Sequence, residues 1–309
     1  MRARNTSQPA PREFGVPAKT ARSALEERPA TAPAKAPRSA LRNSVLRNVA
    51  MVVAYDGSPF QGWQIQPHGP TVQGKLEEAL GLVCREPVKL YGSGRTDTGV
   101  HALHQMANFR VPEDMDLRKL RAGLNGLAAP AISVRQLLPV AEDFHARHSA
   151  IGKTYRYHLF NRPYPPVFTR QGCWWIRTPL DVEAMREAAQ ALVGTHDFSA
   201  FRARECGARS PVRKVKRLEL SEGERPDSTL RIEIEASGFL QHMARIVIGT
   251  LTAVGLGRLT PGDIPAILAG RQREDAYATA PGRGLYLVRV DYDLERFPEL
   301  RALDIPTTP

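Results

Sequence analysis

The feature that most constrains the fold is an order of strands and helices that occurs twice along the chain. In the first half, apolar alternation and helical spacing predict strands over 48–55, 87–91, 105–111 and 132–138, and helices over 71–84 and 117–127. In the second half they predict strands over 153–160, 212–220, 230–236 and 284–292, and helices over 181–193, 240–254 and 261–269. Each half has the order β-α-β-β-α-β, which is that of a ferredoxin-like unit. We therefore expect an α+β (mixed α/β) protein in which two such halves, 47–141 and 142–296, form one broad, mainly antiparallel sheet with helices packed on it.

Local signals support several of these elements. Residues 230–236 alternate apolar with charged side chains, which is typical of a strand with one buried face. Thr71 is a suitable N-cap for the first helix, and Gly194 is expected to cap the end of the 181–193 helix. Residues 297–309 are expected to be a C-terminal tail.

The positive charge is concentrated at the N-terminus. The 309 residues carry a net charge of +11, but residues 1–48 hold ten Lys/Arg against three acidic residues, so the other 261 carry only +4. Residues 1–46 are rich in Ala, Pro and Arg and lack an apolar period, which predicts a disordered tail. The tail could be passive, an RNA-attracting arm or a transit peptide, and its composition does not separate these.

Composition excludes other classes of protein. No apolar run approaches the roughly 18 residues of a membrane span. The three cysteines Cys84, Cys173 and Cys206 are too far apart for a CxxC zinc site and too few for a disulfide framework. A reducing, cytoplasmic location is the simplest expectation, and the basic charge favours nucleic acid as the partner.

The most unusual segment is the glycine-rich stretch 91–104, YGSGRTDTGVHALH, between two expected strands. It presents one carboxylate (Asp97), one guanidinium (Arg95) and two histidines (His101, His104). A loop at a strand end often carries reactive side chains, but a structural turn in which Asp97 bonds local amides fits equally. A metal site is disfavoured, because residues i and i+3 of a strand face opposite sides.

A second cluster is basic. Residues 202–217 hold seven Lys/Arg and one acidic residue, which suits contacts to RNA phosphates or a solvated strand edge. The candidates for phosphate contacts are Arg202, Arg204, Arg209, Arg213 and Lys214.

Taken together, these segments resemble the bacterial tRNA pseudouridine synthase A (TruA) family. The resemblance spans residues 48–295, with GSGRTDTGVHALHQ at 92–105 as its most specific motif. Further matches lie at 54–67, 71–80, 143–157, 196–205, 238–249 and 278–287. It implies the pseudouridine synthase fold and a homodimer with RNA lying across the two subunits. It also implies isomerisation of uridines 38, 39 and 40 in the anticodon stem-loop of tRNA, with no metal or cofactor.

The resemblance also implies residue roles. Asp97 matches the nucleophile, Arg95 the residue that helps displace the target base, and Arg245 the arginine that pairs with the aspartate. Tyr155 matches the tyrosine that packs against the uridine, and Leu285 an apolar residue of the uracil pocket. Ala244 stands where the family usually has valine, and 127–132 and 280–285 depart from its pattern, but the expected nucleophile is intact. A different target position in RNA, or a non-catalytic RNA-binding module, is the alternative.

Overall fold

The computed structural model describes residues 45–223 and 229–303, so most of the predicted N-terminal tail lies outside the described residues. The first half contains β1 (Leu46–Tyr55), α1 (Val72–Cys84), β2 (Tyr91–Gly92), β3 (His101–Pro112), α2 (Leu117–Ala128) and β4 (Ile132–Pro139). The second half contains β5 (Ala150–Asn161), β6 (Trp174–Ile176), α3 (Val182–Gln190), β7 (Gly194–Asp197), β8 (Val212–Glu222), β9 (Leu230–Ala236), α4 (Met243–Gly255), α5 (Asp263–Gly270) and β10 (Leu285–Tyr292). The repeated β-α-β-β-α-β order is confirmed, and α5 matches the helix predicted over 261–269. The short strands β6 and β7 are additions that the sequence patterns do not predict.

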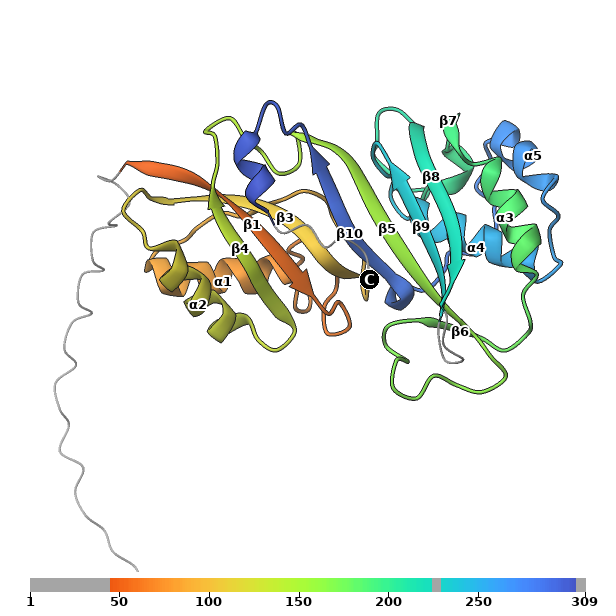
Figure 1. The fold of residues 1–309 in the computed structure, drawn as a ribbon, viewed down its shortest axis with the longest axis horizontal. Helices are drawn as coiled ribbons and strands as arrows, with labels where there is room; N and C mark the ends of the chain where they lie inside the picture. The colour runs from red at the N-terminus through yellow and green to blue at the C-terminus, as the bar shows by residue number, and fades with distance from the viewer. Residues whose placement is uncertain (1–44, 224–228, 304–309) are drawn as a thin grey trace, which may run out of the picture. The chain divides into compact units, whose positions relative to one another are not determined.

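One sheet runs through both halves, in the order β4-β1-β3-β10-β5-β9-β8-β7 (Figure 1). Within each half, the fourth, first and third strands of the repeat are neighbours in that order: β4-β1-β3 in the first half and β10-β5-β9 in the second. The two halves join where β10 pairs in parallel with the start of β3. We call this β3–β10 pairing the seam. The short strand β2 pairs antiparallel with β3 further along, and most other pairs are also antiparallel. The predicted broad, mainly antiparallel sheet is confirmed.

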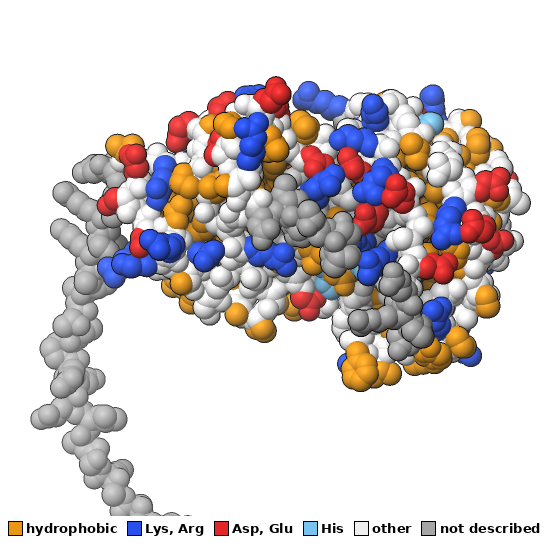
Figure 2. Space-filling model, in the orientation of Figure 1, with side chains coloured by type: hydrophobic (Ala, Val, Ile, Leu, Met, Phe, Trp, Pro, Cys, Tyr) orange, Lys and Arg blue, Asp and Glu red, His pale blue; other side chains and the backbone are white. Residues whose placement is uncertain are grey.

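The two faces of the second half differ sharply. Every second residue of β9, beginning at Leu230, is buried in the apolar core, as the alternation predicts. The opposite face carries ion pairs between different strands of the sheet, and Figure 2 shows acidic and basic side chains intermixed there. They include Arg156–Glu233, Arg217–Glu233 and Arg289–Glu235. In Figure 1, α4 passes behind these strands, on the apolar side.

In the first half, irregular segments cover the sheet face that the helices leave open. Asn48 on β1 donates to the backbone oxygens of Ala141 and Phe144, which holds the 141–149 connection against the strands. The Phe144 ring packs on Tyr292 and Phe297 with centroids 5.1 and 5.2 Å apart. Phe297 is buried, as are Leu300 and Leu303 beyond it, so the segment predicted as a C-terminal tail packs on the core as far as residue 303. Their apolar side chains complete the core.

Phe144 offers a direct test of this covering layer. Phe144→Ala should lower the free energy of unfolding by about 3–5 kcal/mol, because it removes a buried ring and leaves a cavity. Urea denaturation followed by circular dichroism measures the effect. The control is Phe168→Ala on the loop before β6, where the side chain is 99% exposed and the change should be within about 0.5 kcal/mol. Equal effects for both variants would contradict the packing.

Three local predictions fail for physical reasons. The strand predicted over 87–91 shrinks to β2, because side chains of α1 take the backbone groups of Leu90: its N–H donates to Glu77 Oε1 and its oxygen accepts from Gln73 Nε2. Gly194 does not cap α3, which ends at Gln190; with φ +116° it begins β7 instead. The helix predicted from residue 240 begins at Met243, because His242 has a left-handed backbone, φ +62°.

Candidate active site

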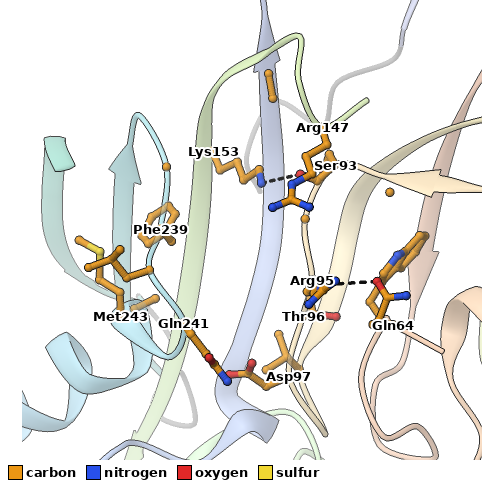
Figure 3. A pocket seen from close by; sticks show the side chains of 18 of the residues that line it. Gln64, Ser93, Arg95, Thr96, Asp97, Arg147, Lys153, Phe239, Gln241 and Met243 are labelled. Atoms are coloured by element: carbon orange, nitrogen blue, oxygen red, sulfur yellow. Dashed lines mark hydrogen bonds between the residues drawn. The ribbon is translucent and has the colours of Figure 1, made fainter. Parts of the chain in front are cut away.

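The 93–100 loop leaves the sheet at the seam. β2 and β10 pair with different stretches of β3, and the loop connects β2 to the start of β3 between them. It borders a cleft of about 1140 Å³ that is lined by residues of both halves, among them Arg245. Figure 3 shows Asp97, Lys153 and Phe239 on the walls of this cleft. The loop that is most unusual in sequence thus lies where the two halves meet.

Contacts to the two residues before Asp97 hold the loop. The Tyr55 hydroxyl lies 2.8 Å from Thr96 Oγ1, and Trp63 N–H donates to the Thr96 carbonyl at 3.0 Å. Thr96 is therefore buried, while its neighbours Arg95 and Asp97 line the cleft. Arg95 is exposed, and its Nε donates to Gln64 Oε1 at 3.2 Å (Figure 3).

Two glycines permit close approach to the loop backbone. A Cβ at Gly62, where φ is +86°, would lie 2.5 Å from the Thr96 carbonyl oxygen. A Cβ at Gly282 would lie 2.3 Å from the Thr98 carbonyl oxygen. Any side chain at these positions would collide with backbone atoms, so segments from both halves clamp the loop only because they carry glycine there.

Asp97 is half-buried and faces two basic side chains of the second half. Arg245 Nη1 donates to Asp97 Oδ2 at 2.8 Å, and Arg245 Nε donates to the Ala280 carbonyl at 2.8 Å, which fixes the guanidinium. The pairing implied by the family resemblance is thus present in the geometry. His242 Nε2 lies 3.6 Å from the same carboxylate oxygen, at the left-handed residue that precedes α4.

Tyr155 and Leu285 lie on neighbouring strands and both line the cleft. The Tyr155 ring meets Phe239 edge-on with centroids 4.9 Å apart. Burial, followed by the nearby Tyr55 and Asp97, raises the pKa of Tyr155 well above its usual range, so its hydroxyl stays protonated. Leu285 is buried, so these two side chains give the cleft an aromatic and an aliphatic wall.

The basic residues predicted to contact phosphate separate into two groups. Arg213 lines the cleft, whereas Arg202, Arg204, Arg209 and Lys214 do not. Arg204 instead forms an ion pair with Glu274. The structure also brings to the cleft three basic residues that the sequence patterns do not single out, Lys153, Arg147 and His242. All three lie inside the matched motifs, but nothing in their spacing distinguishes them from solvated charged residues.

The two histidines of the 91–104 segment are buried in β3. His101 Nδ1 accepts from Gly57 N–H at 3.1 Å, and its Nε2 lies 3.0 Å from the Arg283 carbonyl. Within residues 45–223 and 229–303, no group of three or more His, Cys, Asp or Glu could hold a metal ion. Over the same ranges, no helix has the length and apolar character needed to cross a membrane.

Comparison with known proteins gives a consistent family. The family model described as tRNA pseudouridine synthase matches residues 51–149 and 188–293, which include Asp97 and Arg245. The chain is 43% identical over 244 residues to tRNA pseudouridine synthase A of Syntrophotalea carbinolica, covering 79% of this chain and 96% of that one. It is 44% identical over 247 residues to the protein of that name from a Thermoanaerobacter species, covering 80% and 100%. For Chromobacterium violaceum the identity is 43% over 245 residues, covering 79% and 92%. With its fold and its cleft, the chain belongs to the tRNA pseudouridine synthase family, a family of isomerases.

Proposed function

We propose that this protein isomerises uridine to pseudouridine at positions 38, 39 and 40 in the anticodon stem-loop of tRNA, with Asp97 as the nucleophile. The observation that carries the proposal is the Asp97 carboxylate, which is presented in the cleft at the seam and bonded to Arg245 at 2.8 Å. Membership of the tRNA pseudouridine synthase family supports the reaction class.

The reaction needs an anionic group beside the sugar. The bond between N1 of uracil and C1′ breaks, the base turns, and C5 bonds to C1′, while the C5 proton is lost and N1 gains one. There is no net oxidation or reduction. The carboxylate of Asp97 can attack C1′, abstract the 2′ proton or add to C6 of the uracil. The Arg245 guanidinium, which is itself held by the Ala280 carbonyl, orients the carboxylate that each route uses.

The uridine must leave its stack to reach Asp97, which costs a few kcal/mol. An aromatic face at Tyr155 and an aliphatic wall at Leu285 offset part of that cost, because bases stack on aromatic rings. Arg95, exposed next to Asp97, is suited to occupy the place that the base vacates. Arg213 in the cleft is suited to contact the RNA backbone.

Release of tritium tests the reaction directly, since the C5 proton is lost. The purified protein should release tritium from tRNA that carries [5-³H]uridine. Mapping of pseudouridine in tRNA from cells that lack the gene should show losses at positions 38–40. Tritium release with losses at other positions would overturn the proposed target, and no release from any tRNA would overturn the reaction.

Tyr155 should contribute through its ring face. In an Asp97→Asn background, which removes turnover, Tyr155→Leu should weaken binding of an anticodon stem-loop RNA by about 5- to 150-fold, because one base loses its stacking partner. Tyr155→Phe keeps the face and should bind within a few fold of the parent. Fluorescence anisotropy with labelled RNA measures both affinities. Equal affinities for the Leu and Phe variants would show that no base stacks there.

We also propose that the protein acts in the cytoplasm as a homodimer with tRNA lying across both subunits. Light scattering at micromolar concentration, with and without tRNA, tests the assembly. A monomer under both conditions would contradict it.

A further inference from the structure

Lys153 reaches into the cleft from β5, two residues before Tyr155 and on the same side of the strand. Its Nζ donates to the carbonyl oxygen of Ser93 at 2.7 Å, at the start of the loop that carries Asp97 (Figure 3). The ammonium lies close against the loop backbone, since a Cβ at Gly94 would be 2.6 Å from its nitrogen. An ammonium has three N–H donors, so Ser93 leaves it further capacity on the cleft side.

A second cation lies close to Lys153. Burial, and after it the charge of Arg147, lower the pKa of Lys153 to about 8. Figure 3 shows the Arg147 guanidinium beside the Lys153 ammonium, above Arg95 and Asp97. Arg147 is exposed, on the connection that leads into β5. Two positive groups are therefore held together although each destabilises the charge of the other.

No acidic side chain within the described ranges forms an ion pair with either cation. The Asp97 carboxylate, which shares the cleft, is bonded to Arg245. On the opposite face of the sheet, by contrast, the half-buried Arg217 and Arg289 each have glutamate partners. The two cations in the cleft lack such a counter-charge among the residues described.

We propose that Lys153 and Arg147 form a binding site for a backbone phosphodiester of the RNA substrate, close in the chain to the uridine that is modified. A phosphodiester carries one negative charge and oxygens that accept from an ammonium and a guanidinium together. The loop from Ser93 to Asp97 spans at most about 14 Å. The site therefore anchors the strand within reach of the nucleophile and fixes the place where the uridine turns out. It rests on the proposed function, whose RNA substrate it binds.

The salt dependence of RNA binding tests the site. With a labelled anticodon stem-loop, the slope of log K against log salt concentration should become shallower by about 0.7–1 in Arg147→Gln and in Lys153→Gln, because each loses a phosphate contact. Lys153→Arg keeps the charge and should keep the wild-type slope. The control is Arg135→Gln, an exposed arginine on β4 that does not line the cleft.

An uncharged phosphate mimic locates the contact. A set of RNAs, each with one methylphosphonate at a position flanking the uridine, should include one that weakens wild-type binding but causes no further loss with Arg147→Gln. The proposal is overturned if no such RNA exists, or if both Gln variants lose affinity with the wild-type slope, which would make Lys153 only a brace for Ser93. Because Arg147 is exposed, its variant keeps the test valid if Lys153→Gln fails to fold. Tritium release by the wild type tests the proposed function separately.

Discussion

Replacing Asp97 with asparagine should abolish pseudouridine formation, with a fall in kcat of at least about 10⁴-fold. Asparagine keeps the shape of the side chain and can still accept from Arg245, but it lacks the negative charge that every route to C1′, the 2′ proton or C6 requires. RNA affinity should stay within a few fold of wild type, because Thr96 rather than Asp97 anchors the loop to Tyr55 and Trp63. Single-turnover tritium release and anisotropy measure the two effects.

The control for this loss is Asp114→Asn, which removes an exposed carboxylate outside the cleft and should leave kcat unchanged. Asp97→Ala guards against slow deamidation of the asparagine and should be equally inactive. Wild-type turnover by Asp97→Ala would remove Asp97 from the chemistry, whereas loss of RNA binding in both Asp97 variants would mean that the side chain positions the RNA.

Sequence patterns predict the local elements well where neighbouring residues decide the outcome. The alternation of 230–236 becomes β9, with the apolar side chains in the core. Thr71 caps α1 as expected, and its hydroxyl accepts from the Gly74 amide. In both cases the stabilising contacts either lie within the segment or are made by the apolar face that the segment's own pattern predicts. The two ferredoxin-like halves follow from the order of such elements.

Contacts between distant segments decide the features that the sequence does not predict. Residues 87–91 have the composition of a strand, yet side chains of α1 take the backbone groups of Leu90. Charged residues surround Phe297 in the sequence, yet its side chain is buried beside Phe144. Local sequence patterns do not predict the parallel seam either, since its paired residues, such as Tyr286 and His101, lie 185 positions apart in the chain. Tertiary structure overrides local propensity at these places.

The site shows the same division. Asp97 stands out because its loop is unusual, but the partner that fixes it, Arg245, is 148 residues away and is named only by the family resemblance. His242 and Lys153 become noticeable only once the fold places them in the cleft: His242 through its left-handed backbone near Asp97, and Lys153 through an uncompensated charge. Each half of the repeat supplies what the other lacks, since the first carries the carboxylate and the second the groups around it.

Since Arg245 is the second-half residue that holds Asp97, Arg245→Met should lower kcat by about 10²- to 10³-fold. This is the effect of removing one fixed donor beside a reacting group. The side chain is 17% exposed and bridges Asp97 Oδ2 and the Ala280 carbonyl. The backbone bond from Ala280 N–H to the Arg245 carbonyl remains in the variant, so the loop should stay in place. Single-turnover kinetics at saturating RNA separate the chemical step from binding.

Arg245→Lys separates charge from geometry. Lysine keeps the positive charge but cannot hold a planar fork between the carboxylate and the carbonyl, so its kcat should fall between those of the wild type and the methionine variant. Arg258→Met is the matched control, since Arg258 follows α4, is exposed and does not line the cleft. If Arg245→Met loses RNA affinity in proportion to activity while single-turnover chemistry is unchanged, Arg245 binds RNA and does not orient Asp97. A lysine variant as slow as the methionine variant would mean that orientation of the carboxylate, more than its neighbouring charge, limits the reaction.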